Sequence, residues 1–295
     1  MRCECNRREF LRIGSVAITA AALGTFSTTA GDTPKKRSLK KAIMYATIGY
    51  KGSVMEKFDA VKAAGFSGVE PMSHMKQEEV LKALDATGLQ AASVCCDTHW
   101  SKPLSHPDPA KRQEGLEGLL VALKDAKRYG ASSVLLVPGV VNKDVNYDQC
   151  FERSVAEIRK AIPLAKDLDV KIAVENVWNN FITKPEQAKA FLDEINSDYV
   201  GWHFDIGNVL RFGAPETWIA TLSPRILKLH IKEYSAAKRF DVRFFEGDND
   251  WPTIMKALDT AGYKGWAISE QPGAQASDAK ALKDLSDRME RILAS

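Results

Sequence analysis

Four side chains of metal-binding type each stand at the end of a short apolar run: Glu175, Asp205, His230 and Glu270. The intervals between them are 30, 25 and 40 residues, and each interval is long enough for one loop, one helix and the next strand. Any one of these side chains alone is explained as well by solvation or by an ion pair. Four of them at the ends of consecutive runs predict instead that they meet at one site.

Three carboxylates that surround one imidazole predict a bound cation. In a partly buried pocket they would carry about three negative charges, which could not stay ionised without a counter-ion. One divalent metal ion held by Glu175, Asp205, His230 and Glu270 resolves this conflict. Oxygen and nitrogen ligands suit manganese, our first expectation, and also magnesium, cobalt or zinc.

The elements that must position these residues alternate regularly from Ala42 onward. Short apolar segments alternate with longer segments of helical period, which is the pattern of repeated βα units. Eight such units favour a single-domain (β/α)8 TIM barrel of the α/β class over residues 42–295. The predicted strands lie near residues 42–47, 67–70, 90–96, 132–137, 170–175, 200–205, 225–230 and 265–270, and the predicted helices near 53–64, 76–86, 109–129, 147–168, 184–195, 214–221, 251–261 and 276–293.

The period of a strand decides which side chains face the inside of this barrel. Active sites of TIM barrels lie at the C-terminal ends of the strands, where all four proposed ligands stand. Alternation places His203 on the same face as Asp205 and Lys228 on the same face as His230, while Phe204 points toward the helices. We therefore expect more than one polar side chain inside the barrel.

Residues 1–30 have the pattern of an export signal. A twin-arginine core at residues 7–11 precedes an apolar run at 13–26 and small residues that end near Ala30. The run is too short for a stable membrane span, although a membrane anchor is the alternative. We expect export by the twin-arginine machinery to the periplasm or another extracytoplasmic location, with residues 31–41 as a linker.

Charge and cysteine content restrict the class of protein. The formal net charge is +3, and removal of residues 1–30 would leave about +1, because four arginines and two glutamates would be lost. This balance indicates no nucleic-acid partner. The cysteines beyond residue 30 are Cys95, Cys96 and Cys150, an odd number that does not form a disulfide framework. The vicinal pair is most simply small core residues, with a metal or redox role as the alternative.

Four sequence stretches resemble the xylose-isomerase-like TIM barrels grouped as sugar phosphate isomerases and epimerases. They are Glu175-Asn-Val-Trp-Asn-Asn, His203-Phe-Asp-Ile-Gly-Asn208, Lys228-Leu-His-Ile-Lys232 and Glu246-Gly-Asp-Asn-Asp-Trp251-Pro. The likeness covers about residues 42–290 and is greatest to epimerases that act at C3 of L-ribulose 5-phosphate and of D-tagatose. It implies one divalent metal on the four strand-end residues.

The resemblance also implies roles for individual residues. It makes Glu175 and Glu270 the acid and base, and Asn208 and Lys232 match the epimerase pattern in place. The D-tagatose epimerases have a histidine where this chain has Asn208, and their substrate-binding arginine has no clear counterpart here. Arg239 and Arg243 are the nearby candidates. These departures leave the identity of the sugar open.

The predicted activity is isomerisation or epimerisation of a ketose or keto-sugar. One glutamate removes a proton next to the carbonyl and the other returns it from the opposite face, through an enediolate that a metal stabilises as a Lewis acid. The candidate substrate-binding residues are His203, Asn208, Lys232, Glu70 and His99, although His203 is equally explained as a core residue. An exported enzyme meets neutral sugars more readily than phosphorylated ones.

Three other functions stay open. The same chemistry would support a lyase that releases a leaving group from a keto-glycoside by β-elimination. A metal-dependent endonuclease can share the fold, but it would need more histidines than the five of this chain and a more basic surface. A non-catalytic sugar-binding protein would not need both glutamates. A homo-oligomer is also possible.

Overall fold

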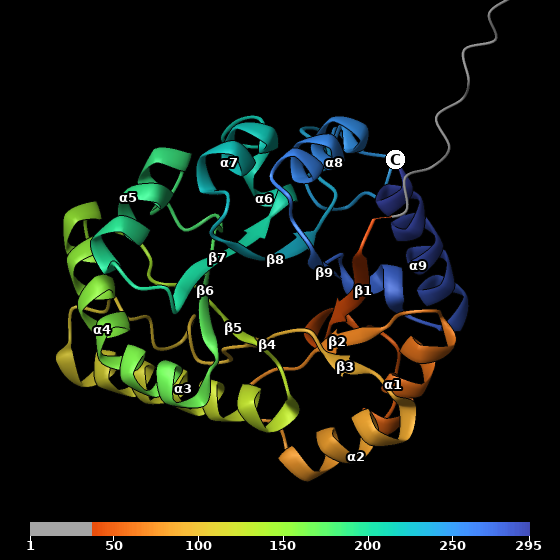
Figure 1. Ribbon diagram of the computed structural model, residues 1–295, viewed down its shortest axis with the longest axis horizontal. Coiled ribbons are helices and arrows are strands. Elements are labelled where there is room, and N and C mark those ends of the chain that lie inside the picture. Colours follow the sequence, from red (N-terminus) through yellow and green to blue (C-terminus); the bar gives the residue numbers. More distant parts are fainter. Residues whose placement is uncertain (1–36) are drawn as a thin grey trace, which may run out of the picture. The chain divides into compact units, whose positions relative to one another are not determined.

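The computed structural model describes residues 37–295, and its strands form one parallel sheet. The strand order around the sheet is β3-β2-β1-β9-β8-β7-β6-β5-β4. Figure 1 shows these strands inside a ring of helices. The strands are β1 (Leu39–Met44), β2 (Gly68–Glu70), β3 (Gln90–Ala91), β4 (Val94–Cys95), β5 (Ser133–Leu136), β6 (Lys171–Glu175), β7 (Val200–Asp205), β8 (Ile226–Ile231) and β9 (Gly265–Ser269).

The two edge strands of this order, β3 and β4, are halves of one predicted strand, 90–96. The first half pairs with β2 and the second half with β5, so the segment between them closes the ring. A parallel bridge between Met72 and Cys95 and a backbone hydrogen bond of 2.8 Å from Cys95 to Pro71 join the second half to the β2 side as well. The predicted eight-stranded TIM barrel is therefore confirmed, with its third strand interrupted.

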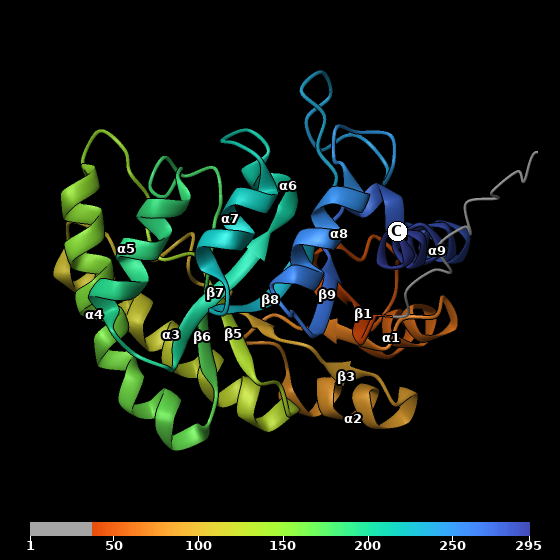
Figure 2. The ribbon, with the colours of Figure 1, turned by 45° about the horizontal axis from the view of Figure 1, so that its top comes forward.

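The helices follow the strands as the sequence period predicts, and Figure 2 shows them along the outside of the strands. Local signals set several of their ends. Ser53 and Asn146 form capping boxes at two helix starts, and Gly88 and Gly130 end two helices in the left-handed conformation. The helices are α1 (Val54–Ala63), α2 (Gln77–Thr87), α3 (Pro109–Tyr129), α4 (Tyr147–Leu168), α5 (Pro185–Ile195), α6 (Ile206–Val209), α7 (Pro215–Leu222), α8 (Trp251–Thr260) and α9 (Ala279–Ala294), with short 3-10 turns η1 (Tyr45–Thr47) and η2 (Gly273–Ala276).

The first strand begins earlier than expected. It starts at Leu39, so residues 39–41 of the segment predicted as a linker pair with β9. The proposed export signal, residues 1–30, lies outside the described residues. Within the described part of the chain, no helix is both long enough and apolar enough to cross a membrane.

The core has two apolar layers separated by the sheet. Between the sheet and the helices lie large side chains such as Trp202, Phe204 and Leu229, all fully buried. Inside the barrel a smaller apolar cluster contains Ala42, Met44, Ala92, Cys95, Leu135 and Ile268. The alternation places Phe204 outside and Asp205 inside, as expected. All three cysteines of the described residues are buried and free, which agrees with their interpretation as small core residues.

Candidate metal centre and active-site cavity

The four predicted ligands converge at the C-terminal end of the barrel. Glu175, Asp205 and His230 belong to β6, β7 and β8, and Glu270 directly follows β9. One candidate ligand atom from each lies within 4.8 Å of those of the other three. His230 Nδ1 is 2.9 Å from Glu175 Oε1, 3.3 Å from Glu270 Oε2 and 3.9 Å from Asp205 Oδ2. The topology therefore brings together residues that are up to 95 positions apart.

One lysine also enters this cluster. Lys232, two positions after His230, places Nζ 2.8 Å from Glu270 Oε2 and 3.5 Å from Asp205 Oδ2. It also donates to Asn208 Oδ1 at 3.4 Å. Lys232 thus supplies one positive charge beside two of the three carboxylates.

The pKa values of the cluster move in different directions. Burial raises the pKa of Glu175 and raises that of Asp205 well above its usual range, against the attraction of His230 and Lys232 respectively. Burial would also raise the pKa of Glu270, but the charges of Lys232 and His230 hold it well below its usual range. Burial disfavours the charged form of His230, yet Glu270 and Glu70 raise its pKa well above 6.5. Burial therefore disfavours the ionised forms of Glu175 and Asp205, and among the three carboxylates the charges of Lys232 and His230 outweigh burial only at Glu270.

This electrostatic conflict and the donor set both fit a divalent cation. The three carboxylate oxygens and the one imidazole nitrogen already point at a common volume, and the charge of a cation would favour all three carboxylates in ionised form. Glu175, Asp205, His230 and Glu270 would hold the ion.

Asparagines fix the ends of the two strands that carry Glu175 and Asp205. Asn176 donates to the Asp205 carbonyl at 2.9 Å and accepts from Trp202 Nε1 at 2.9 Å. Asp205 caps α6 by accepting from the Asn208 backbone at 2.7 Å, and the Asn208 side chain donates to the Asn176 carbonyl at 3.0 Å. Asn176 was not among the predicted site residues, although it follows Glu175 in the recognised motif.

A cavity of about 240 Å³ opens next to the cluster. Of the predicted substrate-binding residues, His99, Asn208 and Lys232 line it. Its apolar wall includes Trp178, which packs on Phe240 with ring centroids 4.8 Å apart. The complete lining is Met44, Cys95, His99, Trp100, Leu135, Glu175, Val177, Trp178, Asn208, Lys232, Phe240 and Glu270. An apolar wall with a few polar groups at one end is typical of a small-molecule site.

Two predicted substrate-binding residues are placed elsewhere. Glu70 and His203 are completely buried and do not line the cavity. Glu70 Oε2 lies 2.9 Å from His230 Nε2, on the side of the imidazole away from the other carboxylates, and the His203 ring lies 4.2 Å from the His230 ring. Glu70 ends β2 and His203 belongs to β7, and both side chains contact the His230 imidazole inside the barrel instead of the cavity. For His203 this agrees with the alternative of a core residue.

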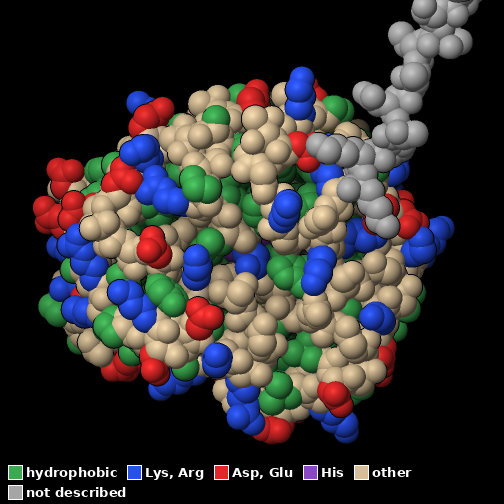
Figure 3. All heavy atoms as spheres, viewed as in Figure 1, with side chains coloured by type: hydrophobic (Ala, Val, Ile, Leu, Met, Phe, Trp, Pro, Cys, Tyr) green, Lys and Arg blue, Asp and Glu red, His purple; other side chains and the backbone are tan. Residues whose placement is uncertain are grey.

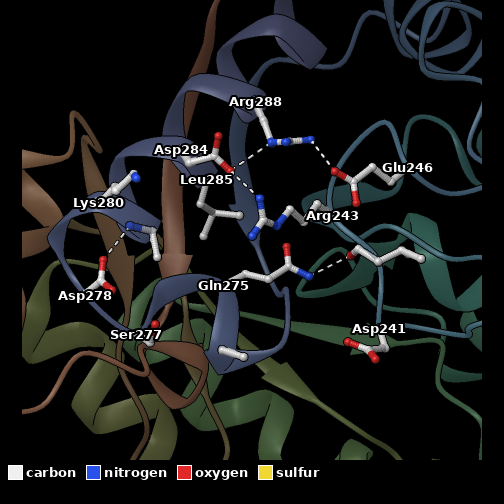
Figure 4. Close-up of a pocket in the computed structure, with 13 residues that line it drawn as sticks. Asp241, Arg243, Glu246, Gln275, Ser277, Asp278, Lys280, Asp284, Leu285 and Arg288 are labelled. Atoms are coloured by element: carbon white, nitrogen blue, oxygen red, sulfur yellow. Dashed lines mark hydrogen bonds and ion pairs between the residues drawn. The ribbon is translucent and has the colours of Figure 1, made fainter.

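The two arginines considered as substrate contacts do not line the cavity either. Arg243 lies in a separate surface groove of about 590 Å³ between the segment after β8 and the segment from η2 to α9. Figure 4 shows four charged side chains of that groove, Arg243, Glu246, Asp284 and Arg288, close together. Arg288 lies 2.9 Å from Asp284 and 3.2 Å from Glu246, and Arg243 lies 3.9 Å from Asp284. Arg239 occupies a turn with a positive φ in the same segment.

Surface charge is mixed on the face shown in Figure 3. Lysine and arginine side chains are interspersed there with aspartate and glutamate, without one large area of a single sign. The electrostatic potential of that face would therefore attract a polyanion such as a nucleic acid only weakly.

A buried carboxylate that the sequence analysis missed organises the segment between β8 and α8, which contributes Phe240 to the cavity. Glu233 is fully buried. It accepts hydrogen bonds from Trp251 Nε1 and the Phe245 backbone, both at 2.8 Å, and from the Asn249 backbone at 3.2 Å. No helical or strand period marks this segment, so only the Lys232-Glu233 position directly after a strand could have identified it.

Replacing Glu233 with alanine is expected to lower the free energy of unfolding by at least about 3 kcal/mol, because several buried donors would lose their acceptor at about 1–3 kcal/mol each. Urea denaturation measures this. Glu246→Ala in the same segment is the matched control, since Glu246 is half exposed in a surface ion pair worth at most about 1 kcal/mol. Equal losses from both variants would contradict a special role for Glu233.

Known proteins share this sequence pattern and this fold. A family model described as a xylose isomerase-like TIM barrel matches residues 58–292. L-ribulose-5-phosphate 3-epimerase UlaE of Salmonella paratyphi A is 23% identical over 251 residues, which cover 77% of this chain and 87% of that protein.

Two solved structures show a similar fold at lower identity. D-psicose 3-epimerase from Clostridium cellulolyticum H10, solved with D-tagatose, has a TM-score of 0.72 at 18% identity over 87% of this chain and 100% of its own. The 3-keto-D-glucoside 4-epimerase YcjR of E. coli has a TM-score of 0.72 at 16% identity over 86% of this chain and 98% of its own.

Proposed function

The chain belongs to the xylose isomerase-like TIM barrel family, and from this we propose that it is a divalent-metal-dependent sugar epimerase or isomerase that acts on a ketose or keto-sugar. The observation that carries the proposal is the placement of two glutamates at one cavity. Glu175 from β6 and Glu270 from the end of β9 both line the cavity and both lie within 3.3 Å of His230 Nδ1. The relatives named above are sugar epimerases.

The two glutamates are suited to proton transfer at a carbon next to a carbonyl. A divalent cation bound at the cluster, with manganese as the first candidate, would supply Lewis-acid polarisation of the substrate carbonyl. Lys232 holds Glu270 ionised, and Glu175 lines the same cavity, so each carboxylate can exchange a proton with the substrate in turn. Because β7 and β8 separate their strands, the two carboxyl groups approach the substrate from different parts of the ring.

The other cavity residues would bind and orient the sugar. Lys232 and Asn208 present polar groups beside Glu270. His99, which follows β4 in the chain, also lines the cavity. Burial lowers the pKa of His99 to about 4, so the ring is neutral and can bind a hydroxyl without adding charge. Trp178 and Phe240 would pack on the apolar face of a sugar ring.

A neutral sugar fits this cavity better than a phosphorylated one. Among the described residues that line it, Lys232 is the single lysine or arginine, and two carboxylates already contact it. A phosphate group would need further cationic donors. This supports a free ketose, a keto-sugar or a keto-glycoside, and it agrees with the export to the periplasm that we propose from residues 1–30.

A lyase that acts on keto-glycosides is the second candidate. Trp100 lines the cavity yet is 54% exposed, so it could pack against a second sugar or an aglycone outside the reacting ring. Removal of the proton next to the carbonyl could then expel that group.

Proton exchange in heavy water tests the proposal. Purified protein loaded with manganese is incubated with a panel of free ketoses, ketose phosphates and 3-keto-glycosides, and NMR follows deuterium at carbon and the products. We expect deuterium incorporation with formation of an epimer or isomer from a neutral substrate. Release of an aglycone identifies the lyase instead. Absence of exchange across the panel, in protein that is folded and binds metal, would reject both activities.

A further inference from the structure

We propose that Glu70 is a positioning residue for the metal site, because it holds the His230 imidazole in the tautomer that presents Nδ1 to the cation. This role rests on the metal site of the proposed function. It replaces the substrate contact predicted for Glu70 from its place at the end of β2.

The two nitrogens of His230 face different environments. Nδ1 faces the carboxylates of Glu175, Glu270 and Asp205, whereas Nε2 faces Glu70 Oε2 at 2.9 Å. A neutral imidazole carries its proton on one nitrogen and a lone pair on the other. An ionised Glu70 only accepts hydrogen bonds, so it keeps the proton on Nε2 and leaves the lone pair of Nδ1 for the cation.

The contact with His230 is the main polar contact of the Glu70 side chain. Its side chain is completely buried, and the bond to His230 is the one hydrogen bond that its carboxylate makes among the described residues. Its other oxygen lies 3.9 Å from His203 Nδ1, too far for a hydrogen bond. Burying a carboxylate with so few hydrogen-bond partners costs folding free energy. The contact with His230 is the one feature of the described residues that explains why a glutamate occupies this position.

A basic side chain inside the barrel interacts electrostatically with Glu70. Lys228 lies opposite His203 in the strand register, is buried, and donates to Ser132 Oγ at 2.9 Å. Burial lowers the pKa of Lys228 to about 8, and the charge of Glu70 opposes this lowering. Partners of this kind orient a histidine ligand and raise its basicity, and their loss typically weakens metal binding by about 10- to 100-fold.

A second cation site is the competing interpretation of the same residues. Ligand atoms of Glu70, His203 and His230 also lie within 4.8 Å of one another. The nearby ammonium of Lys228 opposes a cation there, and the Nε2 proton of His230 would have to leave as well. Two bound ions per chain would therefore overturn the positioning role.

Two variants of Glu70 separate its charge from its hydrogen bond. Glu70→Gln keeps an acceptor without the charge, and we expect about tenfold weaker manganese binding with the Nε2–H tautomer retained. Glu70→Leu removes both, and we expect about 100-fold weaker binding and loss of the Nε2–H signal of His230. Calorimetric titration with manganese gives affinity and stoichiometry. Histidine 15N NMR of the zinc-loaded protein gives the tautomer.

The control is Glu157→Gln, a buried glutamate on α4 that pairs with Arg112 and Lys160 far from the cluster in the fold. It should leave metal affinity unchanged. If wild-type protein binds manganese and both Glu70 variants bind it equally well, the positioning role is overturned while the metal site stands. If the wild type binds no metal, the proposed function and the role of Glu70 are both rejected. Should Glu70→Leu not fold, Glu70→Gln decides alone.

Discussion

Replacing Glu270 with glutamine is expected to reduce epimerisation by about 100- to 10,000-fold, the usual contribution of a positioned acid or base. Glu270 lines the cavity, and Lys232 and His230 hold its pKa well below the usual range against the effect of burial, so its carboxylate is ionised and can accept a proton. Glutamine keeps an oxygen toward the cluster but accepts no proton. Metal titration measures any loss of affinity separately, and turnover should stay low when the variant is saturated with metal.

The two-base mechanism predicts that the two epimers differ in proton exchange when one base is removed, whereas a mechanism with a single base does not. In the Glu270→Gln variant, Glu175 can still exchange the proton of the epimer that faces it, without inversion, whereas the other epimer should exchange no proton. Both epimers are tested separately in heavy water, with Glu117→Gln as the control because Glu117 is exposed on α3. Unchanged epimerisation in metal-loaded Glu270→Gln would remove Glu270 from the chemistry.

The sequence predicted the barrel and the cluster because both depend on strand periodicity. Asp205 and His230 each end an apolar run, and a barrel brings the ends of its strands together at one side. The sequence therefore predicted that these two residues lie close together, although it gives no distances. The same alternation placed His203 and Lys228 inside the barrel, and both are buried there. Periodicity does not show which of the side chains inside the barrel line the cavity.

Two of the predicted substrate-binding residues, Glu70 and His203, are buried and do not line the cavity. Glu70 ends β2 as Glu175 ends β6, but its carboxylate contacts Nε2 of His230, whereas that of Glu175 contacts Nδ1 and lines the cavity. The conformation of the segment after β8 could not be predicted from the sequence either. Its shape depends on hydrogen bonds from residues 245, 249 and 251 to Glu233, and no local sequence rule encodes such contacts.

Metal binding is expected to stabilise the protein, and to do so more strongly as the pH rises. A ligand at a hundredfold excess over its dissociation constant adds about 2.7 kcal/mol to the free energy of unfolding. The pH dependence comes from His230, whose pKa is raised well above 6.5 by Glu270 and Glu70 although burial opposes its charge. The stability from the protonated ring of the metal-free protein is fully present below 6.5 and is lost as the pH rises through the raised value.

The cation competes with that same proton, which reverses the trend in the metal-bound protein. Binding at Nδ1 requires the proton to leave, so the affinity should rise over the range in which the metal-free form loses stability. Thermal unfolding with and without manganese, from about pH 6 to about pH 8.5, should therefore show a widening gap. The variant His230→Gln removes the titrating ligand and should show neither the gap nor its growth. A gap of constant size in the wild type would mean that the metal does not displace a proton from His230, and that the ion binds elsewhere.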